Sequence, residues 1–311
     1  LRYSTPASED SPSKLFLKLS KPGFDAEIAA RFGERESQYY NVIAKSMNDS
    51  PSATCYDAAF SADTGKSHML LADLTETHFQ TDWPLPPSKA HCETVLDSFA
   101  RFHAAWWDHP QLGNSIGKFP TSDSIDEYVR SMEKKFAGFV DFLDDRLSAE
   151  RRRLYERVLS RAPEVWKQRI RVPNYGGKHL TLIHGDAHFW NCLYPRRLDQ
   201  DKAYIIDWQC WRIDTATDDL AYMIALHWFP ERRRVLERDL LKNYHDKLLK
   251  FGVRNYYWDA CWHDYRLSVI GNLFIPLWQW SAKLWPAIWW PHLERAFMAF
   301  EDLDCEELLR S

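Results

Sequence analysis

Glycine is scarce in this sequence: the chain has 311 residues, and only 11 of them are glycine. That is about half the usual share, so a fold built from many tight hairpins is not expected and helices are favoured. A basic excess is also absent: the chain has 40 Lys and Arg residues and 44 Asp and Glu residues, which gives a formal net charge of −4. Without such an excess, binding along the phosphate backbone of a nucleic acid is not expected.

The six cysteines form no C-x-x-C pair anywhere in the chain. Their spacing therefore matches neither a zinc site nor a dense disulfide framework. We expect most of them to be buried thiols of a protein in a reducing compartment. The first ten residues, LRYSTPASED, contain no apolar core and do not predict a signal peptide. The expected location is the cytoplasm.

A long hydrophobic run is missing as well. Residues 267–282, LSVIGNLFIPLWQWSA, carry no formal charge. The segment is shorter than the roughly 20 apolar residues that a membrane-spanning helix needs. It predicts a buried or pocket-lining helix, and no membrane partner is expected.

Aromatic residues, in contrast, are abundant: the chain has 15 Trp, 14 Tyr and 17 Phe residues. Hydrophobic residues make up 45% of the chain and charged residues 27%, which is the composition of an ordinary globular protein. The length suits two lobes rather than one small module.

Residues 1–75 predict a small lobe of strands and one helix. Short apolar runs with alternating polarity predict strands at 14–19, 53–60 and 67–72. Between the first two, residues 24–47 place apolar side chains at helical spacing, interrupted near a glycine. This lobe ends before a proline-rich connection.

Residues 76–311 predict a larger, mostly helical lobe with two short strands inserted in it. Ser124 and Glu127 have the spacing of a capping box at the start of a helix. The expected elements are helices at 88–108, 124–146, 148–168 and across most of 218–309, a loop at 172–178, and strands at 179–183 and 203–207. The predicted fold class is therefore α+β, with two lobes.

Three polar residues follow the two inserted strands: Asp186 and Asn191 in LIHGDAHFWNCL, and Asp207 in IIDWQ. A loop after a strand can present such side chains at a cleft. One carboxylate can orient a hydroxyl group and accept its proton, while an Asn oxygen and a second carboxylate can hold a hard cation against phosphate oxygens. The pattern favours magnesium-dependent phosphate chemistry, with Asp186 as the catalytic base and the other two residues as Mg²⁺ ligands.

The motif H-G-D-x-H-x-x-N followed by I-D-W resembles the aminoglycoside phosphotransferase and choline kinase superfamily, which has the protein-kinase-like fold. From Asp207 the chain reads DWQCWRIDTATDDLAYM, which is similar to the D-F-Q…D-L-A stretch of the ecdysteroid-kinase-like branch. FARFHAAWW at 99–107 resembles a helix of the same branch. The resemblance covers roughly residues 3–230 and implies a small-molecule kinase that uses ATP and Mg²⁺.

The resemblance extends to the small lobe. Lys18 in the strand LFLKL resembles the phosphate-binding lysine of this fold, and its implied partner is Glu36 in ESQYY. MLLADL resembles the hinge of the family, so the backbone at Leu71, Ala72 and Asp73 is implied to bind adenine. Ala72 stands where the family has Glu, which removes a side-chain contact and leaves the backbone contacts.

One expected feature is missing. The glycine-rich phosphate loop of the family should precede Lys18 by about two strands, but residues 1–13 contain no glycine. Either the first strand and its loop were omitted from this sequence, or this member lacks them. The start at Leu rather than Met favours omission.

Five further residues have two interpretations each. His184 fits a structural role, with its imidazole bonded to backbone near the loop, better than a role as proton carrier. His188 either holds the loop or touches phosphate. Asp214 stands where relatives carry Gly, and is either a turn residue or faces the substrate. Trp278 and Trp285 either pack in the core or form a wall of the acceptor pocket.

The expected activity is transfer of phosphate from ATP to the hydroxyl group of a small-molecule alcohol, by a monomer or homodimer. An apolar, sterol-like acceptor is favoured because the C-terminal helices are aromatic rather than acidic. Choline-type and aminoglycoside-type acceptors stay open, the former through cation–π contacts. A catalytically silent, nucleotide-binding pseudokinase is the alternative from another class. A protein kinase is disfavoured, because Gly185 stands where H-R-D has Arg.

Overall fold

The computed structural model describes residues 12–20, 25–171 and 179–310, with the side chains of 169–171 left aside. The predicted loop at 172–178 and the N-terminal segment before residue 12 lie outside these ranges. The chain divides into two compact units, each built from two stretches of sequence. Unit 1 comprises Leu1–Ala105 and His184–Trp211, and unit 2 comprises Trp106–Ile183 and Arg212–Ser311. The lobe boundary predicted near residue 75 stays a prediction.

Unit 1 carries two small antiparallel sheets and two long helices. Its strands are β1 (Leu15–Leu19), β2 (Cys55–Ser61), β3 (Lys66–Ala72), β4 (His78–Phe79), β6 (Cys192–Pro195) and β7 (Tyr204–Ile205). Its helices are α1 (Ala26–Gln38) and α2 (Lys89–Trp106), with short helical turns at Tyr39–Ile43, Ala44–Ser46, Phe189–Asn191 and Trp208–Cys210. The strand orders are β1-β3-β2 and β4-β6-β7.

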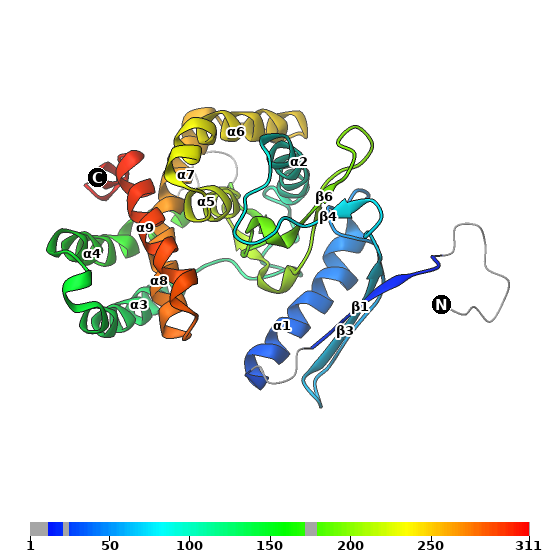
Figure 1. Cartoon of the computed structure of the whole chain (residues 1–311), viewed down its shortest axis with the longest axis horizontal. Coiled ribbons are helices and arrows are strands. Elements are labelled where there is room, and N and C mark those ends of the chain that lie inside the picture. The colour runs from blue at the N-terminus through cyan, green and yellow to red at the C-terminus, as the bar shows by residue number, and fades with distance from the viewer. Residues whose placement is uncertain (1–11, 21–24, 172–178, 311) are drawn as a thin grey trace. The chain divides into compact units, whose positions relative to one another are not determined.

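The β1-β3-β2 sheet is covered on one side by α1, which runs along it in Figure 1. Asp25 begins this helix, because its side chain accepts hydrogen bonds from the N–H groups of Glu27 and Ile28 at 3.0 and 3.1 Å. Gly33 permits the close approach: a Cβ atom there would lie 2.8 Å from the Cβ atom of Ser67 on β3. The glycine that interrupts the apolar pattern is thus the contact point with the sheet.

The predicted helix over 24–47 is helical from Ala26 to Ser46, but only its first part is an α-helix. The α-helix ends at Gln38 and continues as a π-helical turn, Tyr39–Ile43, and a 3₁₀ turn. The Tyr39 ring stacks on the Trp208 ring, with centroids 4.0 Å apart and planes 5° apart. Burial of this aromatic pair compensates for the irregular helical hydrogen bonding.

In its described residues, unit 2 is mainly helical, and its two strands form one short ladder. Its elements are α3 (Ser122–Leu143), α4 (Ala149–Arg171), β5 (Thr181–Ile183), β8 (Arg212–Asp214), α5 (Thr217–Ala221), α6 (Pro230–Lys250), α7 (Trp258–Asn272), α8 (Phe274–Ser281) and α9 (Pro286–Asp302). Helical turns lie at Asp144–Arg146, Tyr222–Leu226 and Cys305–Leu309. In the β5–β8 ladder, Thr181 is opposite Asp214. The predicted α+β class is confirmed.

The capping box of α3 lies one turn earlier than predicted. Thr121, not Ser124, is the N-cap residue. The Thr121 hydroxyl accepts a hydrogen bond from the Ser124 N–H at 3.1 Å, and the Ser124 hydroxyl accepts one from the Thr121 N–H at 2.8 Å. Serine takes the place of the usual Glu or Gln in this arrangement, which is why a search for Ser-x-x-Glu selects the wrong register.

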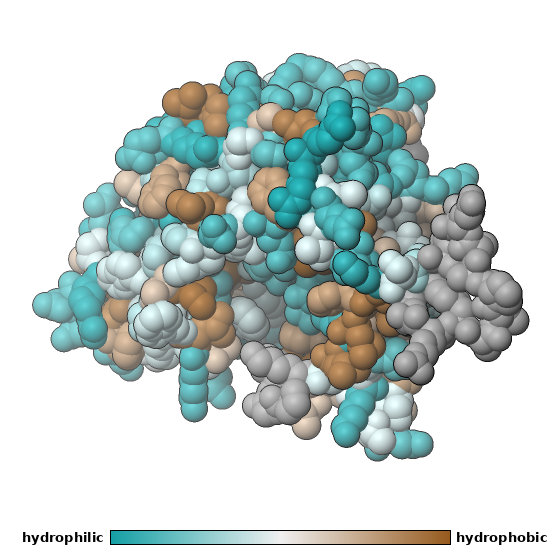
Figure 2. Space-filling model, turned by 45° about the vertical axis from the view of Figure 1, so that its right-hand side comes forward, coloured by the Kyte–Doolittle hydropathy of each residue, from teal (hydrophilic) through white to brown (hydrophobic). Residues whose placement is uncertain are grey.

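The apolar segment 267–282 is divided between α7 and α8 and is largely buried, as predicted. Among the residues that the structure describes, no helix combines the length and apolarity that crossing a membrane requires. The structure describes all six cysteines; none forms a disulfide, and four of them are buried. On the face seen in Figure 2, hydrophilic residues predominate and hydrophobic residues form separate small patches.

Candidate active site

Lys18 of β1 is bound by two carboxylates of unit 1. Its Nζ atom lies 2.8 Å from Oε1 and 2.7 Å from Oε2 of Glu36, so the pair predicted from the resemblance forms. The same Nζ atom also donates to Oδ1 of Asp207, a contact that the sequence does not predict. The Glu36 side chain is only 3% exposed, whereas those of Lys18 and Asp207 are about one-third exposed.

The three charges together are net negative. Burial lowers the pKa of Lys18, but the two carboxylates outweigh it and raise the pKa above its usual value. Burial raises the pKa of Glu36, and the Lys18 ammonium only partly offsets it. With all three groups ionised, two carboxylates face one ammonium. The excess of negative charge suits a divalent cation.

Asp207 is held in the left-handed region of backbone conformation, with φ 68° and ψ 51°. Asp and Asn are the non-glycine residues that tolerate this region best. On one side, the Ile206 N–H donates to the Asn191 carbonyl oxygen at 2.9 Å. On the other side, the buried Trp208 indole donates to the Ile205 carbonyl oxygen at 2.9 Å. These contacts fix the carboxylate of Asp207 relative to Asn191.

The His184–Asn191 loop carries Asp186. It turns at Gly185, whose φ of 80° favours glycine. The His188 N–H donates to the Asp186 carbonyl oxygen at 2.8 Å, which closes the turn. The Asn191 Nδ2 atom donates to the Asp186 carbonyl oxygen at 3.0 Å and lies 3.4 Å from its carboxylate Oδ2 atom. Two of the predicted site residues are thus in direct contact.

His184 is buried and bonds to backbone with both ring nitrogens. Its Nδ1 atom accepts from the Asp186 N–H at 3.2 Å, and its Nε2 atom lies 2.9 Å from the Ile206 carbonyl oxygen. An acceptor at Nδ1 and a donor at Nε2 define one neutral tautomer. The ring therefore ties the loop that carries Asp186 to the strand end that carries Asp207. This geometry corresponds to the structural interpretation of His184.

His188 lies beside the predicted base. Its Nε2 atom is 3.7 Å from Oδ2 of Asp186, and its ring centroid is 5.5 Å from that of Trp190. Burial lowers the pKa of His188, and the nearby Asp186 carboxylate only partly offsets this effect. The residue therefore contacts the predicted base through its side chain.

A cavity of about 710 Å³ opens within unit 1. Its polar lining includes Lys18, Glu36, Asn191 and Asp207, and Asn191 in turn binds the Asp186 carbonyl oxygen. The apolar lining residues are Phe16, Tyr40, Ala53, Leu71, Ala72, Leu74, Phe79, Leu193 and Ile206. A cavity with many apolar lining residues and a few convergent polar groups is typical of a site for a small molecule or cofactor.

The sequence analysis missed most of these apolar residues. Leu193 and Ile206 could have been found, because Leu193 lies two residues after Asn191 on β6, and Ile206 lies directly after β7 and directly before Asp207. Phe16 lies on the same face of β1 as Lys18, since side chains alternate along a strand. Tyr40 had no such signal, because its position depends on the π-helical turn.

The three predicted hinge residues all line this cavity. The Ala72 N–H is already bonded to the Thr54 carbonyl oxygen at 2.8 Å, so it is not the donor for a nucleobase. The Asp73 carboxylate accepts from the N–H and the hydroxyl group of Thr75 at 2.9 and 2.5 Å. These bonds lower the pKa of Asp73 and occupy its side chain in a local turn.

The donor atoms near Asp207 fit a magnesium ion. The Nδ2 atom of Asn191 donates to Asp186. The Oδ1 atom of Asn191 can therefore serve as a metal ligand. Asp207 and Asn191 both line the cavity and both offer oxygen, the ligand atom that Mg²⁺ prefers. Two protein ligands are enough for Mg²⁺, which commonly completes its shell with water and substrate phosphates.

The other predicted residues belong to unit 2. Asp214 accepts from Nε of Arg212 at 3.2 Å. Trp278 is 48% exposed and Trp285 is 72% exposed, so neither is a core residue. Their neighbour Trp280 does pack, with its ring centroid 5.4 Å from that of Phe139. A role of the two exposed tryptophans in acceptor binding stays a prediction.

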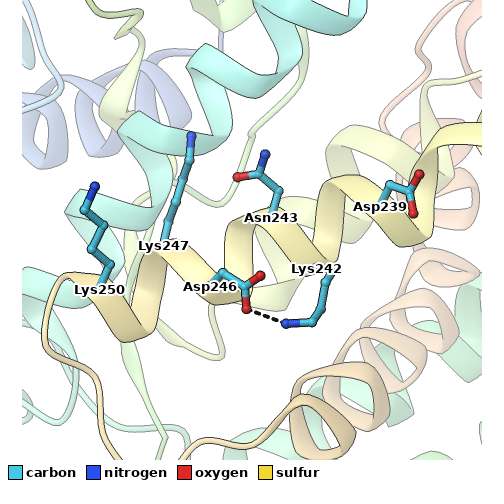
Figure 3. A pocket seen from close by; sticks show the side chains of 6 residues that line it. All are labelled: Asp239, Lys242, Asn243, Asp246, Lys247 and Lys250. Atoms are coloured by element: carbon cyan, nitrogen blue, oxygen red, sulfur yellow. Dashed lines mark hydrogen bonds and ion pairs between the residues drawn. The ribbon is translucent and has the colours of Figure 1, made fainter.

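A second hollow runs along α6 in unit 2 (Figure 3). It is lined by Asp239, Lys242, Asn243, Asp246, Lys247 and Lys250, all from one helix. Lys242 forms an ion pair with Asp246 there, one turn apart on the helix. This surface is formed by one helix and its charges are partly paired, and none of the predicted site residues lines it.

Solved structures place the chain in a fold class. Choline kinase LicA from Streptococcus pneumoniae is 12% identical, with 93% of this chain and 86% of that chain covered and a TM-score of 0.53. Ethanolamine kinase from Plasmodium vivax is 11% identical, with 93% and 75% covered and a TM-score of 0.55. The GDP complex of aminoglycoside 2′-phosphotransferase-IIIa is 13% identical, with 90% and 84% covered and a TM-score of 0.50. The chain has the protein-kinase-like fold of these enzymes.

Residues 22–254 match the ecdysteroid kinase-like family, and the chain belongs to that family. The family that the H-G-D-x-H-x-x-N motif and the stretch after Asp207 resemble is therefore confirmed. No curated protein sequence matches the chain.

Proposed function

We propose that this protein is a kinase that transfers phosphate from ATP, with Mg²⁺, to a hydroxyl group of a small molecule. One observation carries the proposal: Lys18, Glu36, Asn191 and Asp207 line one cavity, and Asn191 binds the loop of Asp186. Among the structural neighbours, LicA is known in complex with AMP and the aminoglycoside phosphotransferase with GDP. These complexes support nucleotide binding as the use of the cavity.

In the proposed reaction, the acceptor hydroxyl oxygen attacks the γ-phosphorus of ATP. The bond between the γ-phosphorus and the bridging oxygen breaks, ADP leaves, and the hydroxyl proton passes to the Asp186 carboxylate. Lys18 would bind the nucleotide phosphates while Glu36 holds its ammonium group in place. Mg²⁺, held by Asp207 and Asn191, would supply neutralisation of the phosphate charge.

The proposed acceptor is an uncharged alcohol with a large apolar body. The family name refers to ecdysteroids, which are hydroxylated sterols. The abundance of tryptophan and the modest net charge of −4 also favour an apolar acceptor over a polycation. Choline, ethanolamine and aminoglycosides, named by the neighbouring structures, are the alternatives.

A pseudokinase is the second candidate. The observation in its favour is that Asp207 is bound to Lys18, so one carboxylate oxygen of the proposed metal ligand is engaged. A protein that kept this pair would bind a nucleotide without transferring its phosphate.

Thermal shift with ATP, with and without Mg²⁺, tests the nucleotide site. Ligand at 100 times its Kd adds about 2.7 kcal/mol to the free energy of unfolding, which raises Tm. We expect a rise that depends on Mg²⁺. No rise with either addition would contradict both candidates.

Turnover separates the two candidates. ADP release is measured with an ecdysteroid, choline, ethanolamine and an aminoglycoside in turn. We expect turnover with the sterol, and a loss of at least about a hundredfold in kcat for Asp186→Asn with an unchanged thermal shift. Asp199→Asn is the matched control, because this aspartate of unit 1 is exposed and forms an ion pair with the exposed Arg197. Nucleotide binding without any turnover would identify a pseudokinase.

A further inference from the structure

We propose that Trp83 and Trp190 form the surface on which the apolar body of the acceptor alcohol rests. The inference depends on the kinase function proposed above and assigns the acceptor contact to a place in unit 1. From the sequence alone, Trp278 and Trp285 were the candidates for this contact.

Trp83 is a large aromatic residue that packing does not account for. Trp83 is 58% exposed, and Leu85, two residues further along the chain, is 61% exposed. A turn holds the two together, since the Leu85 N–H donates to the Asp82 carbonyl oxygen at 2.7 Å. Exposed apolar side chains that gather on an ordered turn are typical of binding sites.

A series of ring contacts connects this surface to the predicted base. The Trp83 ring centroid lies 6.4 Å from that of Trp190, with 49° between the planes. The Trp190 ring centroid lies 5.5 Å from that of His188, and Nε2 of His188 lies 3.7 Å from Oδ2 of Asp186. An alcohol on the tryptophans would therefore have its hydroxyl end toward the group that accepts the proton.

Gln80 connects the same surface to the cavity. Its Nε2 atom donates to the Trp190 carbonyl oxygen at 2.7 Å, and its side chain also lines the cavity beside Asn191. The cavity that would hold the nucleotide and the aromatic surface thus share a border residue. Phosphate donor and acceptor need such adjacency, because the reacting atoms must approach within a few ångströms.

The form of the surface favours a flat, uncharged ligand. A quaternary ammonium group is best bound when rings enclose it on several sides. Here Trp83 is more than half exposed, so the surface is open, and Leu85 extends it with aliphatic area. An extended apolar ring system would cover this area, whereas a small cation would leave most of it in contact with water.

The first test is kinetic. With an ecdysteroid as the acceptor, we expect Trp83→Ala to raise the acceptor KM roughly tenfold, the size expected for loss of one aromatic stack with its buried area. The kcat value and the KM for ATP should stay within about twofold, since Trp83 touches neither the proposed base nor the cavity. Trp83→Phe keeps an aromatic face and should restore most of the affinity. Trp190→Leu should also raise the acceptor KM.

Tyr56→Ala is the matched control, because Tyr56 is an aromatic residue of unit 1 that is 49% exposed and does not line the cavity. It should leave the acceptor KM unchanged. An unchanged KM in Trp83→Ala would overturn the inference and leave the kinase function intact.

Equilibrium dialysis of the same ecdysteroid, in the presence of ATP analogue and Mg²⁺, gives a readout without turnover. We expect the ecdysteroid to bind the wild type saturably. In Trp83→Ala its Kd should rise about tenfold. No saturable binding of the sterol to the wild type would overturn the inference. If choline were then turned over, the kinase function would stand with a different acceptor; if nothing were turned over, that function would fail as well.

Discussion

Glu36 holds Lys18 with both of its carboxylate oxygens, at 2.8 and 2.7 Å from the Nζ atom. The glutamate comes from α1 and the lysine from β1, so the pair fixes the helix to the edge of the sheet. Lys18 also binds Asp207, the proposed metal ligand. A substitution of Glu36 therefore also changes the charge balance around Asp207. The first prediction follows from this sharing.

Replacing Glu36 with Gln should raise the KM for ATP about tenfold or more, which corresponds to loss of a charge-assisted hydrogen bond. Lys18 would then be bound mainly by Asp207, which draws both groups away from a nucleotide and its metal. Glu34→Gln is the control, because Glu34 lies on the same helix and is exposed. Equal KM values for ATP in the two variants would contradict the role given to Glu36.

His184 should matter through backbone geometry. His184→Ala removes two hydrogen bonds from part-buried backbone groups of Asp186 and Ile206, so the free energy of unfolding should fall by roughly 2 kcal/mol. The kcat value should fall at least about tenfold, because the loop that carries Asp186 loses its hydrogen-bonded connection to Ile206. His263→Ala, at a position where the side chain is 55% exposed, should change neither quantity. A stable His184→Ala variant with full kcat would show that the tie is dispensable.

Much of the site was predictable because its polar residues lie close together in sequence. H-G-D-x-H-x-x-N predicted the loop, and the resemblance gave Glu36 as the partner of Lys18, a pair that the structure forms. The Lys18–Asp207 contact joins residues 189 positions apart, and no local pattern reports it.

The elements missed in the fold have a similar cause. The π-helical turn at Tyr39–Ile43 depends on the stacking of Tyr39 with Trp208, far along the chain. The early start of α3 depends on Thr121 and Ser124 hydrogen bonding each other, a pairing that composition does not distinguish from other turns. Apolar cavity walls such as Tyr40 likewise become visible only once distant segments are packed together.

Stability should depend on pH through His188. Burial lowers its pKa in the folded protein, while the unfolded chain has the ordinary value of about 6.5. Below pH 6.5 the unfolded state therefore binds the proton more readily, and stability falls as the pH falls. We expect urea midpoints to drop between pH 7.5 and 5.5, with a smaller drop in His188→Gln. An identical pH dependence in His263→Gln and His188→Gln would contradict this assignment.

Two adjacent arginines of α6 should differ sharply in their contribution to stability. The Arg233 side chain is 1% exposed, and its Nη1 atom lies 2.8 Å from Oε2 of the buried Glu237. The Tyr265 hydroxyl donates to the other oxygen of Glu237 at 2.7 Å. Arg234 is 47% exposed, and its Nε atom lies 2.8 Å from Oδ2 of Asp302, a carboxylate that Arg233 also contacts.

Arg233→Met should lower the free energy of unfolding by roughly 3–5 kcal/mol, because Glu237 would remain buried without its cation. Arg234→Met should lower it by less than about 1 kcal/mol, since water solvates an exposed ion pair well. Urea unfolding of both variants, with slopes compared, measures the difference. The double variant Arg233→Met/Glu237→Leu removes both buried charges and should recover much of the loss, because hydrophobic residues can replace a buried ion pair. Similar losses in the two single variants would mean that burial of Arg233 does not determine its contribution.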